Sequence, residues 1–139
     1  MRDIHLTRVM HAPRSAVWAA LTDPAALAEW LMPNDFAPRL GHRFTFRTKP
    51  APGFDGIVHS EVLAIDPPSE LVLAWRGGPL DTTLRFRLED HSQGTLLTLR
   101  HEGFRGVSNL LPRIVLGLGW KRLLANKLRA RIEGLRHAV

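Results

Sequence analysis

The chain has 139 residues, with 19 Lys or Arg, 13 Asp or Glu and no cysteine. This length fits one domain whose core needs no cross-link, and the lack of cysteine excludes disulfides and thiolate metal sites. The net charge of +6 is uneven, because residues 121–139 hold six basic side chains and one acidic one whereas residues 1–120 are nearly neutral.

The N-terminal segment predicts a strand followed by two short helices. Residues 3–11 alternate loosely between polar and apolar side chains. Pro13 suits a first helical turn, and apolar residues recur after it at helical spacing. Asp23 precedes Pro24, which is typical of an N-cap followed by a first helical position. We therefore expect two short helices within residues 13–31.

From Gly41 onward the apolar period changes to two, which predicts strands. In the clearest strand Leu84, Phe86 and Leu88 face one way and the charged residues between them face the other way. This alternation predicts an antiparallel sheet with one dry and one wet face. Turn sequences separate the five strands predicted here, which are HRFTFRT, IVHSEVLAI, ELVLAWR, TTLRFRLE and TLLTLRHE.

A long C-terminal helix is predicted to cover the dry face. Its apolar positions recur at helical spacing, with basic residues opposite. No linker or repeat interrupts the chain, so residues 1–139 are predicted to form a single domain. The apolar stripe consists of Trp120, Leu123, Leu124, Leu128, Ile132 and Leu135.

An aliphatic run precedes that helix. Between Val107 and Trp120 only Arg113 is ionic. The run is too short to span a bilayer and Pro112 interrupts it, so we expect no integral membrane segment. Two interpretations stay open: a mobile lip beside a cavity, loosened or bent by Gly117 and Gly119, or a segment packed on a closed core.

Several of these segments resemble a known family. HAPRSAVWAALTDPAALAEWL (residues 11–31) is similar to the opening of the START-like superfamily, also called SRPBCC, and to its branch of activators of the heat-shock-protein ATPase. EVLAIDPPSELVLAW, GTLLTLRHEGF and Gly119–Trp120 are similar to later segments of that branch, in the same order. The resemblance implies an α+β helix-grip fold. In that fold a curved antiparallel sheet of about six strands wraps around a long C-terminal helix, two short helices follow the first strand, and an apolar cavity lies between sheet and helix.

Two polar residues stand out against this expected cavity. His101 shares the dry face with Leu97 and Leu99, so it is either a hydrogen-bonded structural residue or a ligand contact, and it is the one candidate for catalysis. Burial should lower its pKa unless a carboxylate pairs with it. Arg131 lies within the apolar arc of the last helix and either forms a salt bridge at the rim or binds an anionic ligand. The predicted ligand-binding residues are Trp30, Phe44, Phe46, Trp75, Phe86, Leu99, His101, Leu116, Trp120, Leu124 and Arg131.

Three functions remain open. The first is binding of a small hydrophobic or amphipathic ligand, such as a lipid, a polyketide-like molecule or an aromatic compound, which a large apolar cavity would favour. The second is a cyclase or hydrolase that uses His101, which a histidine–carboxylate pair in the cavity would favour. The third is a co-chaperone-like protein-interaction module, which a filled cavity and an exposed apolar patch would favour.

The same residues predict few other partners. The seven histidines form no pair four residues apart and no HExxH motif, so we expect no metal and no cofactor. The basic C-terminal residues occupy one helix face without interleaved exposed aromatics, so we expect no nucleic-acid partner. The absence of cysteine fits a reducing cytoplasm, which is the expected location, and a homodimer is left open.

Overall fold

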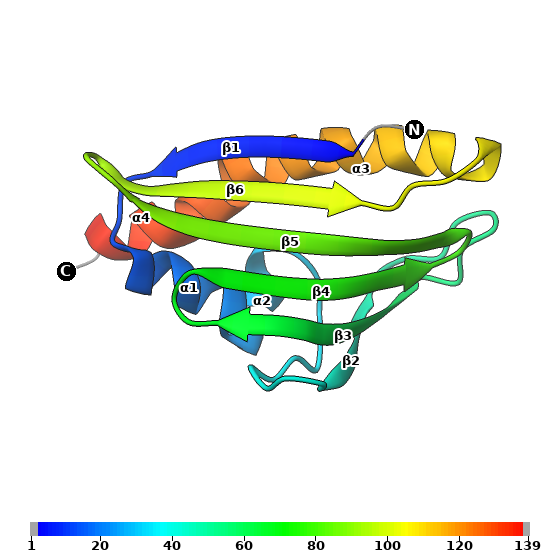
Figure 1. Cartoon of the computed structure of the whole chain (residues 1–139), viewed down its shortest axis with the longest axis horizontal. Coiled ribbons are helices and arrows are strands. Elements are labelled where there is room, and N and C mark those ends of the chain that lie inside the picture. Colours follow the sequence, from blue (N-terminus) through cyan, green and yellow to red (C-terminus); the bar gives the residue numbers. More distant parts are fainter. Residues whose placement is uncertain (1–2, 138–139) are drawn as a thin grey trace.

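Six strands and a long C-terminal helix make up most of the computed structural model, which describes the backbone of residues 3–137 and the side chains of residues 3–134 (Figure 1). The strands are β1 Ile4–Met10, β2 Arg43–Arg47, β3 Ile57–Asp66, β4 Glu70–Gly77, β5 Leu80–His91 and β6 Gly94–Glu102. The helices are α1 Arg14–Thr22, α2 Pro24–Trp30, the 3₁₀ turn η1 Val107–Asn109, α3 Leu110–Arg122, the π-helical segment η2 Leu123–Leu128 and α4 Arg129–His137.

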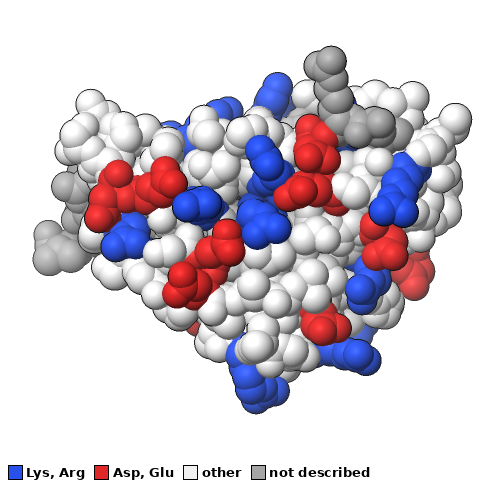
Figure 2. Space-filling model, viewed as in Figure 1, with Lys and Arg blue, Asp and Glu red and all other residues white. Residues whose placement is uncertain are grey.

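The strands form one antiparallel sheet in the order β1-β6-β5-β4-β3-β2. The predicted alternation is confirmed in β5, where Leu84, Phe86 and Leu88 are buried. The outer face of the sheet carries basic and acidic side chains interspersed (Figure 2). The predicted α+β helix-grip fold is therefore confirmed, with its core between the sheet and the helices.

The two short helices begin and end as local sequence chemistry dictates. Asp23 caps α2, since its carboxylate accepts a hydrogen bond from the Ala26 amide at 3.3 Å, and Pro24 occupies the first turn. Trp30 ends α2, and its indole N–H donates to the Ala20 carbonyl at 2.9 Å. This bond joins α2 to α1 and holds the Trp30 ring in the core.

The C-terminal helix begins earlier than the apolar stripe predicts. The aliphatic run is itself helical, as η1 and α3, and lies along the edge strand β1 (Figure 1). Gly117 and Gly119, which were expected to loosen or bend the run, do not interrupt it, because α3 continues through both. Gly117 instead lies against Ile4, where a Cβ atom would be 3.9 Å from the Ile4 side chain. Leu135, the last residue of the predicted stripe, lies outside the described side chains.

Within residues 3–137, no helix combines the length and the apolar character that crossing a bilayer requires.

Candidate functional site: an aromatic core, a buried histidine and a cationic rim

The predicted aromatic ligand contacts form one continuous cluster between sheet and helix. Successive ring centroids from Phe44 through Phe46, Trp75, Trp120 and Phe86 to Trp30 lie between 5.2 and 6.4 Å apart. Most of these pairs are edge-to-face, which favours ring packing beyond simple burial. These six side chains are almost fully buried. The aromatic cluster therefore fills the space in which the sequence predicts a cavity.

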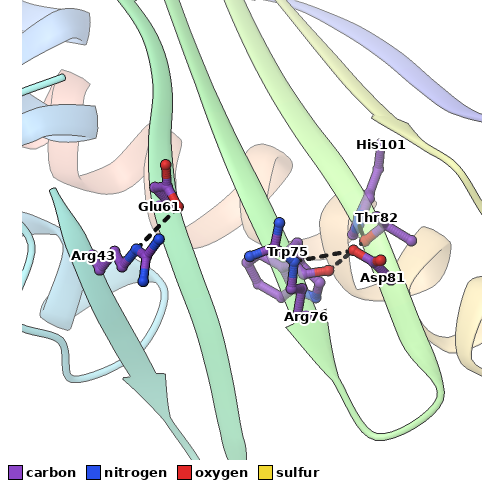
Figure 3. A network of polar contacts seen from close by, with 7 residues as sticks. All are labelled: Arg43, Glu61, Trp75, Arg76, Asp81, Thr82 and His101. Atoms are coloured by element: carbon purple, nitrogen blue, oxygen red, sulfur yellow. Dashed lines mark hydrogen bonds and ion pairs between the residues drawn. The ribbon is translucent and has the colours of Figure 1, made fainter. Parts of the chain in front are cut away.

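His101 lies inside this cluster on β6 and is fully buried. The Trp120 indole N–H donates to His101 Nδ1 at 3.1 Å. His101 Nε2 lies 2.7 Å from Thr82 Oγ1, and the Thr82 hydroxyl donates to the Trp75 carbonyl at 2.8 Å (Figure 3). Three consecutive hydrogen bonds thus connect the C-terminal helix to β6, β5 and β4.

These bonds fix the tautomer of His101. An indole N–H can only donate, so Nδ1 must accept and the ring proton must be on Nε2. The Thr82 hydroxyl then accepts this proton while it donates its own to the Trp75 carbonyl, so every polar atom in the series has a partner. A second ring proton would point at a donor, and no carboxylate is among the hydrogen-bond partners of the ring. Burial lowers the pKa of His101 to about 3, as the sequence predicts for an unpaired buried imidazole.

Removing the hydroxyl in the middle of this series should be costly. We expect Thr82→Val to lower the free energy of unfolding by about 2 kcal/mol, because a buried N–H and a buried carbonyl each lose a partner. Urea unfolding monitored by circular dichroism measures this loss. Thr83→Val is the matched control, since Thr83 is only partly buried and points to the other face. Equal losses in the two variants would contradict the proposed role of the hydroxyl.

Arg131 marks a rim at the other end of the cluster. A depression of about 580 Å³ lies between α2 and the C-terminal helix. Arg131 Nε lies 2.7 Å from a Glu29 carboxylate oxygen, so the salt bridge expected at the rim is present. The Arg131 Nε–H nevertheless has no aligned hydrogen-bond acceptor, and the Glu29 side chain is 63% exposed. The depression is lined by Glu29, Trp30, Lys127, Ala130, Arg131 and Gly134.

The remaining predicted contacts lie around the aromatic cluster. Leu99 and Leu124 are fully buried in the core, and Leu116 is partly buried against it. The structure thus brings ten of the predicted residues together and places Arg131 at the rim. Trp18 is only partly buried, at the edge of the core. His59 is exposed.

Sequence reasoning missed three polar residues. Thr82 is the partner of His101, and Lys127 lines the depression beside Arg131. Ser60 is buried opposite Phe44 and Trp75 on the neighbouring strands, and its hydroxyl has no hydrogen-bond partner. The alternation that placed Leu84 on the dry face also places Thr82 there, and Ser60 lies between two buried valines. Strand alternation therefore could have identified Thr82 and Ser60 as buried polar residues.

A second depression, of about 520 Å³, lies where the loop before β3 meets the β4–β5 hairpin. Its lining includes Asp55, His59 and Arg76, all of them exposed. Arg76 forms an ion pair with Asp81 at 3.1 Å across the hairpin (Figure 3). Among the described residues, no group of three or more His, Asp or Glu side chains is arranged to hold a metal ion.

Comparison with known families settles the relationship that the fold suggests. A family model described as "Activator of Hsp90 ATPase homolog 1-like protein" matches residues 11–133. The chain belongs to this family. The match covers α1, α2, strands β2 to β6 and the C-terminal helix as far as Glu133, but not β1, which ends at Met10. The aromatic cluster and Arg131 therefore both lie within the matched residues.

Solved structures of similar proteins agree with this assignment. The family fold recurs in MLL2253 from Mesorhizobium loti, with 30% identity, a TM-score of 0.85 and coverage of 95% of this chain and 97% of that one. CalU16 from Micromonospora echinospora has 26% identity and a TM-score of 0.76, with 96% and 75% covered. CV1439 from Chromobacterium violaceum has 25% identity and a TM-score of 0.77, with 96% and 99% covered. No curated protein matches the chain.

Proposed function

We propose that this member of the activator-of-Hsp90-ATPase-homolog family binds a small amphipathic ligand with an acidic head group. The depression between α2 and the C-terminal helix carries the proposal, because it places two cations above the edge of an aromatic core. The cations are Lys127 and Arg131, and Trp30 is the ring below them. Binding sites for small molecules combine an apolar wall with a few directed polar groups in this way.

Arg131 is suited to receive the head group. It already lies beside one carboxylate, that of Glu29, but the Nε–H has no aligned acceptor. Glu29 is largely exposed, so its carboxylate can move into solvent at little cost. A ligand carboxylate could take its place and accept a bidentate pair of hydrogen bonds from the guanidinium group, the strongest arrangement available to arginine.

The apolar part of the ligand would extend into the aromatic cluster. The cluster is closed in this structure, so the ligand would have to displace the C-terminal helix from the sheet. The π-helical segment η2 packs on the core through Leu124 and Leu128, and such segments are frequent at functional sites. Inside the core, the unpartnered Ser60 hydroxyl could donate a hydrogen bond to a polar atom of the ligand.

The fold of known proteins is compatible with this class of ligand. DynU16, a protein of the dynemicin biosynthetic locus, shares the fold at 21% identity and a TM-score of 0.76, with 92% of this chain and 46% of that one covered. This association supports a small organic molecule as the ligand.

We also propose a cytoplasmic location, supported by the absence of cysteine.

Laurate and dodecanol test the proposal, because they share a chain length and differ in the acidic head. We expect isothermal titration calorimetry to show laurate binding, and Arg131→Gln to weaken it by roughly tenfold through loss of a charge-assisted pair. Arg100→Gln, on the exposed outer face of β6, is the matched control. Ser60→Ala should weaken binding of both probes without destabilising the free protein, since its hydroxyl has no partner to lose. Absence of laurate binding, or equal affinity for both probes, would contradict the proposal.

The geometry does not favour catalysis by His101. Both ring nitrogens are occupied, and the pKa of about 3 makes the imidazole a weak base at neutral pH.

A second function, interaction through a surface, has a specific observation in its favour, because a filled core occurs together with an exposed apolar face on α3. A homodimer remains a prediction, supported by the Aha1 dimer from Colwellia psychrerythraea. That protein shares the fold with 18% identity and a TM-score of 0.79, with 95% of this chain and 97% of that one covered.

A further inference from the structure

One side of the C-terminal helix exposes a continuous row of aliphatic side chains. Each is between 47% and 89% exposed. Their spacing of three and four residues places them along one face of η1 and α3. We call this row the α3 stripe, which consists of Val107, Leu110, Leu111, Ile114, Val115 and Leu118.

Packing within the protein does not explain why the α3 stripe is apolar. The opposite side of the same helix packs on the protein through Leu116 and Trp120, and Gly117 approaches β1. Among the described side chains, none covers the α3 stripe. Scattered exposed aliphatic residues are ordinary, but a contiguous row of six on one element marks an interaction surface.

The charges along the helix that carries the α3 stripe have one sign. Between Glu102 and Glu133 the sequence contains seven Lys or Arg and no Asp or Glu. Lys121 and Arg122 follow Leu118 by three and four residues, so they continue the same face, and both are exposed. Arg105, which is also exposed, precedes the other end of the stripe. The outer face of the sheet differs, since basic and acidic residues alternate there (Figure 2).

We propose that the α3 stripe docks on an anionic lipid bilayer. The aliphatic side chains would enter the boundary between head groups and acyl chains, and Lys121 and Arg122 would contact the anionic head groups. A helix that lies in the membrane interface combines an aliphatic face with basic residues in this way. This proposal deepens the second candidate function, interaction through a surface, and does not rest on the ligand site.

The composition of the α3 stripe favours a bilayer over a protein partner. The residues that anchor protein interfaces are mainly Trp, Tyr and Arg, whereas Leu and Val are under-represented among them. The α3 stripe holds only Leu, Ile and Val. A second copy of the chain is disfavoured by charge, because a two-fold interface faces the same patch with itself. Either orientation would place Lys121 and Arg122 close to basic residues of the other copy.

Co-sedimentation with vesicles tests the proposal. The full chain should sediment with vesicles of phosphatidylcholine mixed with phosphatidylglycerol, less so at high salt, and not with phosphatidylcholine alone. Lys121→Glu with Arg122→Glu should weaken this binding by at least roughly 30-fold, because two attractions are lost and two repulsions are added at an anionic surface. Leu111→Ser with Ile114→Ser should weaken it by roughly tenfold or more.

Matched variants separate the α3 stripe from general effects. Arg47→Glu with Lys49→Glu makes the same change in net charge on exposed residues elsewhere, and Leu40→Ser with Leu63→Ser removes two other exposed leucines. Both pairs should keep vesicle binding, as should Arg131→Gln at the ligand site. The proposal is overturned if anionic vesicles are not preferred, if either control pair loses binding equally, or if Arg131→Gln abolishes binding. It is also overturned if sedimentation velocity shows a dimer that the α3 stripe variants dissociate.

Discussion

Replacing Trp120 with alanine should lower the free energy of unfolding by about 3–5 kcal/mol, the usual range for a large side chain in a packed core. Trp120 is only 1% exposed and contacts the rings of Trp75 and Phe86. It also donates the hydrogen bond that His101 Nδ1 accepts. The variant therefore loses apolar contacts and leaves a buried acceptor without its donor. Urea unfolding followed by circular dichroism measures the change.

Leu118→Ala is the control for this experiment. Leu118 is on the same helix two residues earlier, but its side chain belongs to the exposed α3 stripe. We expect its free energy of unfolding to change by no more than about 0.5 kcal/mol. A Trp120→Ala variant as stable as Leu118→Ala would show that the helix does not depend on the aromatic cluster. The contrast would also establish which side of α3 faces the protein.

The sheet was largely predictable because one of its faces contacts water and the other contacts the protein core. Alternation identified the side of β5 that carries Phe86 and the side of β6 that carries His101, and both assignments are confirmed. The cap at Asp23 was predictable because the capping bond is local to the chain. The Asp23 cap joins residues that are close in the sequence, and burial in the strands repeats every two residues, so a single sequence reveals both.

The helix was less predictable because α3 is apolar on both sides. One side packs on the core through Leu116 and Trp120, and the other side forms the exposed α3 stripe. Because polar and apolar residues do not alternate at helical spacing here, periodicity could not reveal that residues 107–119 are helical. The segment was consequently interpreted as an approach to the helix, and its glycines as points of bending.

In the candidate site, too, the periodic features could be predicted and the long-range side-chain contacts could not. Burial of Phe86 and the lowered pKa of His101 were predictable from strand alternation, and burial of Trp120 from helical spacing. The partners were not, because Thr82 is 19 residues from His101 and Glu29 lies far along the chain from Arg131. Side-chain partners across strands and helices depend on register and crossing geometry, which a single sequence does not specify.

Acid should destabilise the protein through His101, with an expected loss of about 3 kcal/mol from this residue between pH 7 and pH 4. The pKa of His101 is about 3 in the folded protein, below the usual 6.5 that the unfolded chain recovers. Below pH 6.5 the unfolded chain therefore binds a proton that the folded protein does not. Stability is fully present above pH 6.5 and falls as the pH decreases toward 3, where the folded ring itself begins to be protonated.

His101→Gln isolates this contribution, because glutamine carries one acceptor and one donor at its end but does not titrate. The free energy of unfolding of the variant should fall less steeply between pH 7 and pH 4 than that of the unmodified protein, whatever its stability at neutral pH. His59→Gln is the control, since it makes the same substitution at an exposed position. Equal slopes for all three proteins would mean that His101 is protonated in the folded state. The three-bond series from Trp120 to Trp75 would then be wrong, because its direction requires a neutral ring.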